Sequence, residues 1–302
     1  MKTLLGDLKE LSKDYQNGVK STNIYGIRTF KIGLLSDNTV FPALTIIPIA
    51  ENLSGYRNGG IYRVDREINI EVYVKLGDIT SSSKYIQEIC HYLLDMFYDD
   101  DYPDNYKFLN SSDEATVFSF EPGRIEYQTY GERDQLFQRA IIPLVFSSWE
   151  AAPTFTKTAT ITDTDLRSIG EYIYALLRDD SSLSKIKFFY SHGNPPIKVG
   201  AGVVASVLEN VDQRTRRETG RDNPTGLIDV IVWSKASPFE GALDLNLEQI
   251  ELIKDVLQED QNLGGRVYRS NIDRIEYGIN FESMLYVSRI MFNTYAYNKI
   301  PT

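Results

Sequence analysis

The chain repeats part of its own sequence, and this constrains its fold more than any other feature. Arg124-Ile125-Glu126-Tyr127 recurs as Arg274-Ile275-Glu276-Tyr277, and Arg139 recurs as Arg289 at the same spacing. One short identity can arise by chance, but further matches follow in the same order. They are Lys31-Ile32 with Lys185-Ile186, Glu51-Asn52 with Glu209-Asn210, Ile68-Asn69-Ile70 with Ile228-Asp229-Val230, and Ile86, Ile89 and Leu93 with Ile250, Ile253 and Leu257. The spacing drifts as it does when only loops change length, so the sequence predicts a tandem duplication of one domain.

Length and composition fit two ordinary globular domains. The chain has 302 residues, of which 42% are apolar and 25% are charged, and this is enough for each half to bury its own core. We predict one domain at 1–150 and a second at 165–302. The stretch 151–164, where Ala-Pro and several threonines interrupt the pattern, is the predicted linker.

Three features limit the cellular compartment and the kinds of partner that we expect for the protein. The single cysteine, Cys90, excludes an internal disulfide and a thiolate metal cluster. No apolar run approaches the roughly eighteen residues that a membrane span needs, and residues 1–9 are too polar for a signal peptide. A net charge of −10 argues against broad binding to a nucleic-acid backbone. We therefore expect a protein that is made in a cytoplasm.

Hydrophobic periodicity predicts the same order of elements in both halves. The first half reads as a helix at 4–15, an extended segment at 29–35, strands at 43–49 and 62–75, a helix at 85–97, and a hairpin of 116–130 with 135–147. The second half reads as a helix at 166–177, an extended segment at 186–190, strands at 197–207 and 227–233, a helix at 247–257, and a hairpin of 266–280 with 285–297. Asn246 and Gln249 are spaced like a capping box for the helix at 247–257. The order predicts an α+β domain, a mostly antiparallel sheet flanked by helices, present twice.

The clearest strand is 62–75, because apolar and polar residues alternate along it. Arg66 is its one polar residue on the apolar face. Long loops that make extended hairpins are expected before this strand, at 51–60, and before its counterpart, at 210–226. The loops carry the candidate contact residues for a macromolecular partner: Arg57, Asn58, Arg214, Arg216, Arg217 and Arg221. Clustered arginines suit carboxylate or phosphate partners, and the alternative is a solvated loop.

Other candidate sites are weak. Gly200 and Gly202 fit a dinucleotide-binding pattern, but such a loop opens a helix, and we favour small residues in a strand. Cys90 and His91 are neighbours on a predicted helix, so they point about 100° apart and do not form a ligand pair. The acidic run 98–104 lacks the glycine and terminal glutamate of a calcium loop. We therefore predict no catalytic, cofactor-binding or metal-binding residue, and an assembly or binding role.

The order of elements resembles that of the tail terminator, or tail completion, proteins of tailed bacteriophages. Tyr174–Leu183 resembles the end of their first helix, Pro196–Val199 their proline-led strand, and Ile68–Val74 their alternating strand. The resemblance implies a structural virion protein of the tail or neck that forms a hexameric ring, or a trimer of tandem domains. It also implies the tail tube protein and the head–tail connector as partners, with DNA passing through the lumen without sequence-specific binding. The alternatives are a nucleotide-dependent enzyme that uses Gly200 and Gly202, and a non-viral tandem adaptor.

Overall fold

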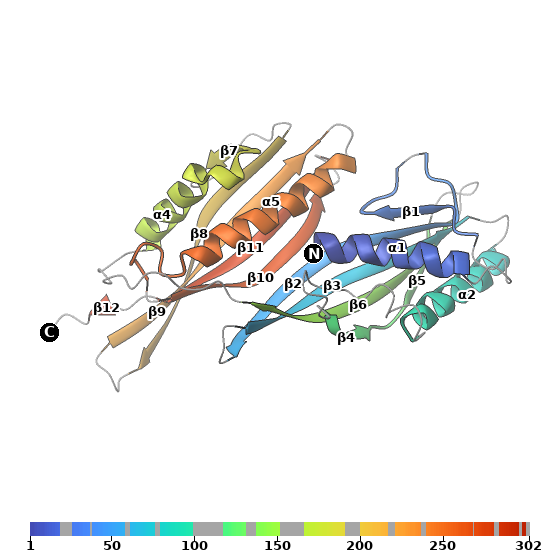
Figure 1. Cartoon of the computed structure of the whole chain (residues 1–302), viewed down its shortest axis with the longest axis horizontal. Coiled ribbons are helices and arrows are strands. Elements are labelled where there is room, and N and C mark those ends of the chain that lie inside the picture. Colours follow the sequence, from blue (N-terminus) through green and yellow to red (C-terminus); the bar gives the residue numbers. More distant parts are fainter. Residues whose placement is uncertain are drawn as a thin grey trace. The chain divides into compact units, whose positions relative to one another are not determined.

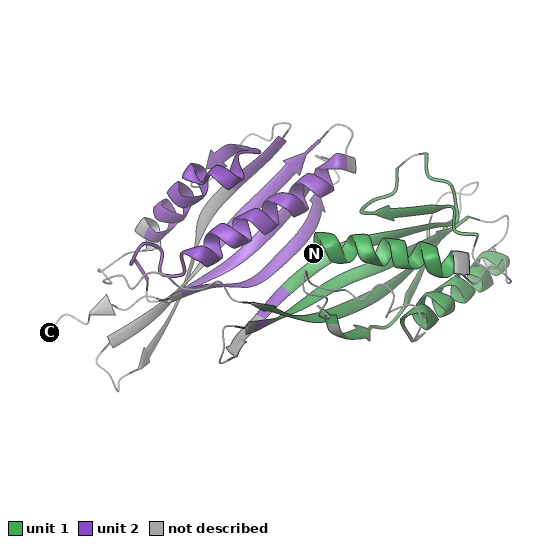
Figure 2. Ribbon diagram, in the orientation of Figure 1, with its two compact units in different colours: residues 1–51, 63–150 green, residues 52–62, 151–302 purple. Residues whose placement is uncertain are grey.

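The computed structural model describes residues 1–18, 26–36, 38–57, 61–75, 79–98, 117–130, 137–151, 166–190, 200–216, 221–236, 240–267, 269–280, 284–295 and 298–299. The fold is α+β, with helices on a mostly antiparallel sheet (Figure 1). The chain divides into two compact units (Figure 2). Unit 1 comprises 1–51 and 63–150, and unit 2 comprises 52–62 and 151–302. Residues 152–165, most of the predicted linker, lie outside the described residues.

Unit 1 begins with a helix and a short parallel strand. Its elements are α1 (Lys2–Gly18), β1 (Thr29–Ile32), β2 (Ala43–Arg57), β3 (Ile61–Val74), α2 (Ile79–Tyr98), β4 (Val117–Pro122), β5 (Glu126–Tyr130) and β6 (Phe137–Ala151). The strand order is β4-β6-β3-β2, with β1 parallel to β2. Both β4 and β5 pair with β6, one after the other along the same strand. The last strand, β6, therefore lies between β3 and the β4–β5 edge.

The core of unit 1 follows the periodicities that the sequence predicts. Leu5, Leu8 and Leu11 of α1 are fully buried, because they recur on one helix face. In β3 the buried residues alternate with half-buried polar ones, as expected for a strand with one face on the core. Gln16 joins α1 to the segment before β1, since its amide bonds both the N–H and the carbonyl of Ile27 at 3.0 Å.

Unit 2 has the same kinds of elements. They are α4 (Leu166–Asp179), the 3₁₀ helix η2 (Ser181–Leu183), β7 (Ile186–Tyr190), β8 (Gly200–Arg216), β9 (Arg221–Lys235), α5 (Glu240–Glu259), β10 (Arg269–Asn280), β11 (Leu285–Tyr295) and β12 (Asn298–Lys299). The strand order is β10-β11-β9-β8-β7, with β7 parallel to β8 and β12 added to β9. Helices α4 and α5 contact each other, and α5 packs on β8 to β11 (Figure 1).

The predicted capping box at Asn246 is wrong. Helix α5 begins at Glu240, so Asn246 lies inside the helix and is 1% exposed. Its side chain donates to the Val232 carbonyl at 3.2 Å and accepts from the Ser288 hydroxyl. Asn246 therefore joins α5 to β9 and β11. A sequence cannot distinguish this role from a cap, because asparagine is common at both helix ends and buried polar junctions.

The two expected extended hairpins are present, but part of each expected long loop is strand. Strand β2 continues to Arg57 and β8 continues to Arg216, while β9 already begins at Arg221. The paired strands are therefore longer than expected, and residues 58–60 and 217–220 lie outside the described part of the chain. The periodicity analysis ended these strands too early, because polar residues such as Glu51 and Asn52 interrupt the apolar pattern.

Gly200 and Gly202 lie in strand β8, as we favoured, and not in a loop that opens a helix. Gly202 is the Cα partner of Trp233 on β9. A Cβ added to Gly202 would lie 2.2 Å from Cζ2 of Trp233, so the indole occupies the space above this glycine. The Phe188 ring stacks on Trp233 with centroids 5.7 Å apart. Gly202 is thus explained by close packing of an aromatic ring.

Candidate partner-contact surface

The end of the β8–β9 hairpin gathers the predicted arginine positions. Its register pairs Arg214 with Asn223, Thr215 with Asp222, and Arg216 with Arg221. Positions 214 and 216 share one strand face, because faces alternate with a period of two. Position 221 lies directly across from 216, so it belongs to the same face. The register therefore places positions 214, 216 and 221 on the same face of the strand pair.

A further basic residue extends this group. Strand β12 pairs Lys299 with Arg221 and Asn298 with Asp222. Positions 216, 221 and 299 thus form a row across three neighbouring strands, which we call the basic row. The sequence analysis did not find Lys299, because its place depends on a pairing between segments far apart in the chain. No local pattern reveals such a pairing.

The basic row is unfavourable for an isolated hairpin. Like charges directly across a strand pair destabilise it by roughly 0.2–1 kcal/mol. A partner that offers carboxylates or phosphates removes this penalty and gains charge-assisted hydrogen bonds. The whole chain carries −10, so the basic row differs in sign from the protein as a whole. That the basic row binds an acidic partner stays a prediction.

The remaining predicted contact residues are placed only in part. Arg57 is the last residue of β2. Asn58 and Arg217 lie outside the described residues. The prediction that 52–60 and 213–226 become ordered against a partner therefore stays a prediction.

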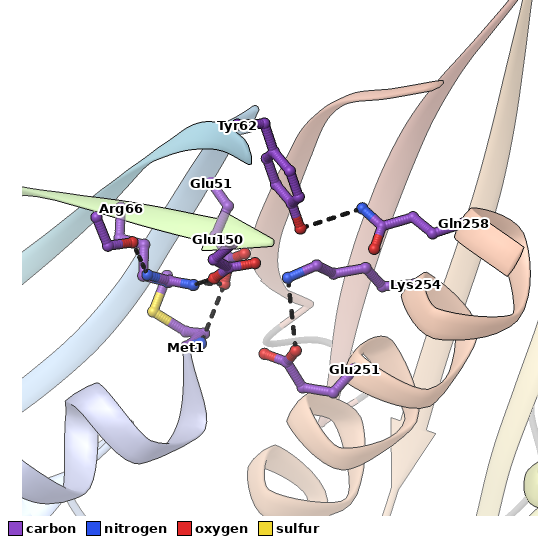
Figure 3. Close-up of polar contacts among 9 residues, drawn as sticks. Met1, Glu51, Tyr62, Arg66, Glu150, Glu251, Lys254 and Gln258 are labelled. Carbon is purple, nitrogen blue, oxygen red and sulfur yellow. Dashed lines mark hydrogen bonds and ion pairs between the residues drawn. The ribbon is translucent and has the colours of Figure 1, made fainter. Parts of the chain in front are cut away.

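Unit 2 also contains the segment Asn52–Tyr62, which begins in β2 and ends in β3. The strand order places β2 beside β10, and Nη1 of Arg274 on β10 donates to Oδ1 of Asn52. Gln258 of α5 donates to the Tyr62 hydroxyl at 3.3 Å (Figure 3). The edge of β10 is therefore completed by a segment from the β2–β3 hairpin.

Charged pairs lie on the sheet face of unit 2 that is turned away from α5. Arg289 binds Asp229 at 2.6 Å through Nε, and its Nη1 lies 3.9 Å from Glu276. Arg274 binds the same Glu276 at 3.2 Å. The register places Arg289 directly across from Glu276. The chain of alternating charges therefore runs from β9 across β11 to β10.

Unit 1 has a related pair with a different register. Arg139 of β6 forms a two-bond contact with Glu71 of β3. Its neighbour across the sheet is Gln128, whereas Glu126 faces Ile141. Arg139 and Arg289 each pair with an acid on a neighbouring strand. Arg289 lies across from Glu276 of the recurring Arg-Ile-Glu-Tyr segment, whereas Arg139 does not lie across from Glu126.

Arg66, the polar residue on the apolar face of β3, lies in a buried charge cluster (Figure 3). Its guanidinium donates to Ser148 Oγ at 2.6 Å and binds Glu150. Arg66 Nε is 3.7 Å from Glu51, which also lies 3.4 Å from the Met1 amine. Two cations and two carboxylates balance in charge. The cluster therefore explains how this arginine is tolerated inside unit 1.

The structure gives the sulfur and imidazole candidates ordinary environments. Cys90 is buried in α2, and burial raises the pKa of its thiol to about 12. His91 is mostly exposed, with Nε2 3.5 Å from Asp95 of the same helix. Within the described residues, no group of three or more His, Cys, Asp or Glu side chains could hold a metal ion. His192 and residues 99–104 of the acidic run lie outside the described part of the chain.

No protein-family model matches the chain, and no curated protein matches it. None of the described helices has the length and apolar content that a bilayer crossing requires.

Proposed function

We propose that the chain is a tandem duplication of a tail-terminator-like domain, and that it serves as a structural ring subunit of a bacteriophage tail or neck. The ring would close the tail tube and join it to the head connector, as a hexamer or as a trimer whose six domains imitate one. The proposal is of a structural protein without catalysis.

The observation that carries this proposal is the shared succession of elements in the two units. Each has a helix, a short strand parallel to the next, a long hairpin, a second helix and a closing pair of strands. In each, the last long strand lies between the edge and the hairpin: β6 in unit 1 and β11 in unit 2. This is the order of elements in the family that the sequence resembles. The proposed duplication and the resemblance to tail terminator proteins are thus supported by the same order of elements.

Electron microscopy and light scattering of the purified protein test this proposal. We expect ring-shaped particles of three or six chains, because closed symmetry is what a sixfold tail requires of a terminator. Added tail tube protein should be capped at one end by the rings. A chain that remains strictly monomeric, and that binds neither tube nor neck proteins, would contradict the proposal.

The nucleotide-dependent alternative now rests on two glycines in a strand. Gly202 lies against Trp233, and the next described element after β8 is the strand β9 and not a helix. Calorimetric titration with NAD or ATP tests it, since measurable binding would favour an enzyme. The non-viral adaptor remains a proposal of lower rank, because no observation favours it over the ring.

A further inference from the structure

The two units differ in how the edge of the sheet is covered. In unit 2 the edge strand β10 has β2 beside it, and Arg274 donates to Asn52 of that hairpin. Residues 52–62 belong to unit 2, and Figure 2 draws the described part of this segment in the colour of that unit. The segment Arg274–Tyr277 is therefore covered, and Ile275 is fully buried.

The same four residue types recur in unit 1 at an edge of the sheet, with no described strand on their outer side. Arg124–Tyr127 spans the junction of β4 and β5, where Arg124 and Glu126 are exposed and Ile125 is half-buried. Tyr127 is 45% exposed. Both strands pair with β6 on one side, and within the described residues no strand pairs with them on the other. An open edge of this kind is a template for another strand.

The hairpin that would match this edge is β8–β9. Strand β7 pairs with β8 only from Ala201 to Val204, although β8 continues to Arg216. Beyond Val204, no strand in the described part of the chain pairs with that side of β8. The sequence match of Glu51-Asn52 with Glu209-Asn210 gives Asn210 the place in this hairpin that Asn52 has in the other. Asn210 lies between Leu208 and Asp212, where the register of β8 against β9 shifts.

We propose that β8 of one copy of this chain adds to the β4–β5 edge of a second copy, with Arg124 donating to Asn210 as Arg274 donates to Asn52. The proposal adds a specific contact between subunits to the proposed ring function, and it rests on that function only for the closing of the ring. The strand pairing itself needs only two copies.

Strand addition of this kind explains both open edges at once. Main-chain hydrogen bonds satisfy the groups that an edge leaves unpaired, and side chains set the register. The contact is head-to-tail, because the surface on one copy differs from the surface on the next. Head-to-tail contacts give a ring when the rotation closes and a filament when it does not. Every unit would then have its sheet edge covered by a hairpin segment.

Cross-linking between copies tests the pairing directly. We would replace Arg124 and Asn210 by cysteine in the full chain and add a short bifunctional maleimide. Cys90 can stay, because it is buried and its thiol, with a pKa of about 12, carries little thiolate at neutral pH. We expect covalent multiples of the 34.5 kDa chain. The matched control combines Asn210→Cys with Lys84→Cys on α2, which is exposed but far in sequence from the edge, and it should stay monomeric on a denaturing gel.

Association measurements give a second readout. Arg124→Ala should weaken self-association by about tenfold or more, the usual effect of losing a hydrogen bond to a charged group. Lys84→Ala should leave association unchanged. The double variant Arg124→Asp with Asn210→Arg should restore it, because the pair is rebuilt with the donor on the other side.

The outcomes separate the strand pairing from the ring. Rings that assemble without the cross-link, and that tolerate Arg124→Ala, would keep the proposed function and overturn the pairing. Cross-linked chains that only form open filaments would keep the pairing and overturn the ring. A chain that does not self-associate overturns both.

Discussion

At the scale of single residues, two positions in the cores decide how other side chains pack. Gly202 on β8 leaves room for the Trp233 ring of β9, and Trp233 is 3% exposed. Arg66 holds Glu51 and Glu150 in the interior of unit 1. A larger side chain at position 202 would overlap the Trp233 ring. A neutral side chain at position 66 would leave Glu51 and Glu150 without this counter-charge.

Gly202→Ala should destabilise the protein, because the new Cβ would overlap the Trp233 ring. Overpacking of this kind costs about 1–3 kcal/mol, and urea unfolding measures it. The matched control is Gly6→Ala, since nothing lies within 4 Å of a Cβ at Gly6 in helix α1. That change should be neutral or stabilise by up to about 1 kcal/mol. Equal effects at both positions would contradict the packing argument.

Arg66→Met should be strongly destabilising. It removes one cation and leaves the carboxylates of Glu51 and Glu150 in or near the interior. Breaking a buried ion pair in this way costs about 3–5 kcal/mol. Arg63→Met, two strand positions from Asp65 and 41% exposed, should cost at most about 1 kcal/mol. Thermal or urea unfolding of both variants checks the difference, and similar losses would show that the cluster contributes little.

At the scale of elements, the sequence predicted what hydrophobic periodicity can report. The helices at 4–15 and 166–177 and the strand at 62–75 lie inside α1, α4 and β3 with one residue in excess at most. The strand ends were missed at 51–57 and 210–216, because polar residues such as Glu51, which is buried, interrupt the apolar pattern. Helix α5 was started too late, because Asn246 resembles a cap in sequence and is a buried junction in the fold.

The candidate site was predictable in its residue types and not in its shape. Arginine clustering pointed to 214–221, but a loop was expected where the structure has paired strands. Lys299 joins them through β12, which only a long-range pairing can bring about. The basic row is therefore a product of sheet register.

Changing Arg214, Arg216 and Arg217 to Ser should weaken assembly and leave folding nearly intact. Surface substitutions usually change stability within about 0.5 kcal/mol, and the removal of like charges from facing strands adds a small gain. Sedimentation at low and physiological salt measures assembly, and urea unfolding measures stability. Normal assembly of the triple variant would mean that the hairpin end is only a solvated connection.

A variant of equal charge change controls for the loss of net positive charge. Lys84 on α2, Arg178 on α4 and Lys185 just before β7 are exposed cations. Their joint replacement by Ser should leave assembly close to that of the unchanged protein. If both triple variants assemble equally poorly, the effect comes from overall charge and not from the basic row.

At the scale of the whole molecule, the two units agree in strand order and differ in register. The closing strands of unit 2 have one shift, between Ile272 and Arg274, and those of unit 1 are interrupted between Pro122 and Glu126. The recurring Arg-Ile-Glu-Tyr segment lies at this irregular place in both. Sequence spacing located the segment but not the residue across from it, because a bulge moves every later pair. A duplication would preserve topology through such changes.

The stacked Trp233 has a spectroscopic consequence. The chain has two tryptophans, and each unit holds one of them: Trp149 in β6 is 37% exposed, while Trp233 in β9 is enclosed by Phe188 and Gly202. Soluble quenchers should therefore reach the fluorescence of unit 1 far more readily than that of unit 2. The fluorescence of the intact protein thus has a quenchable part from Trp149 and a protected part from Trp233. Each unit can therefore be followed through unfolding or assembly without an added label.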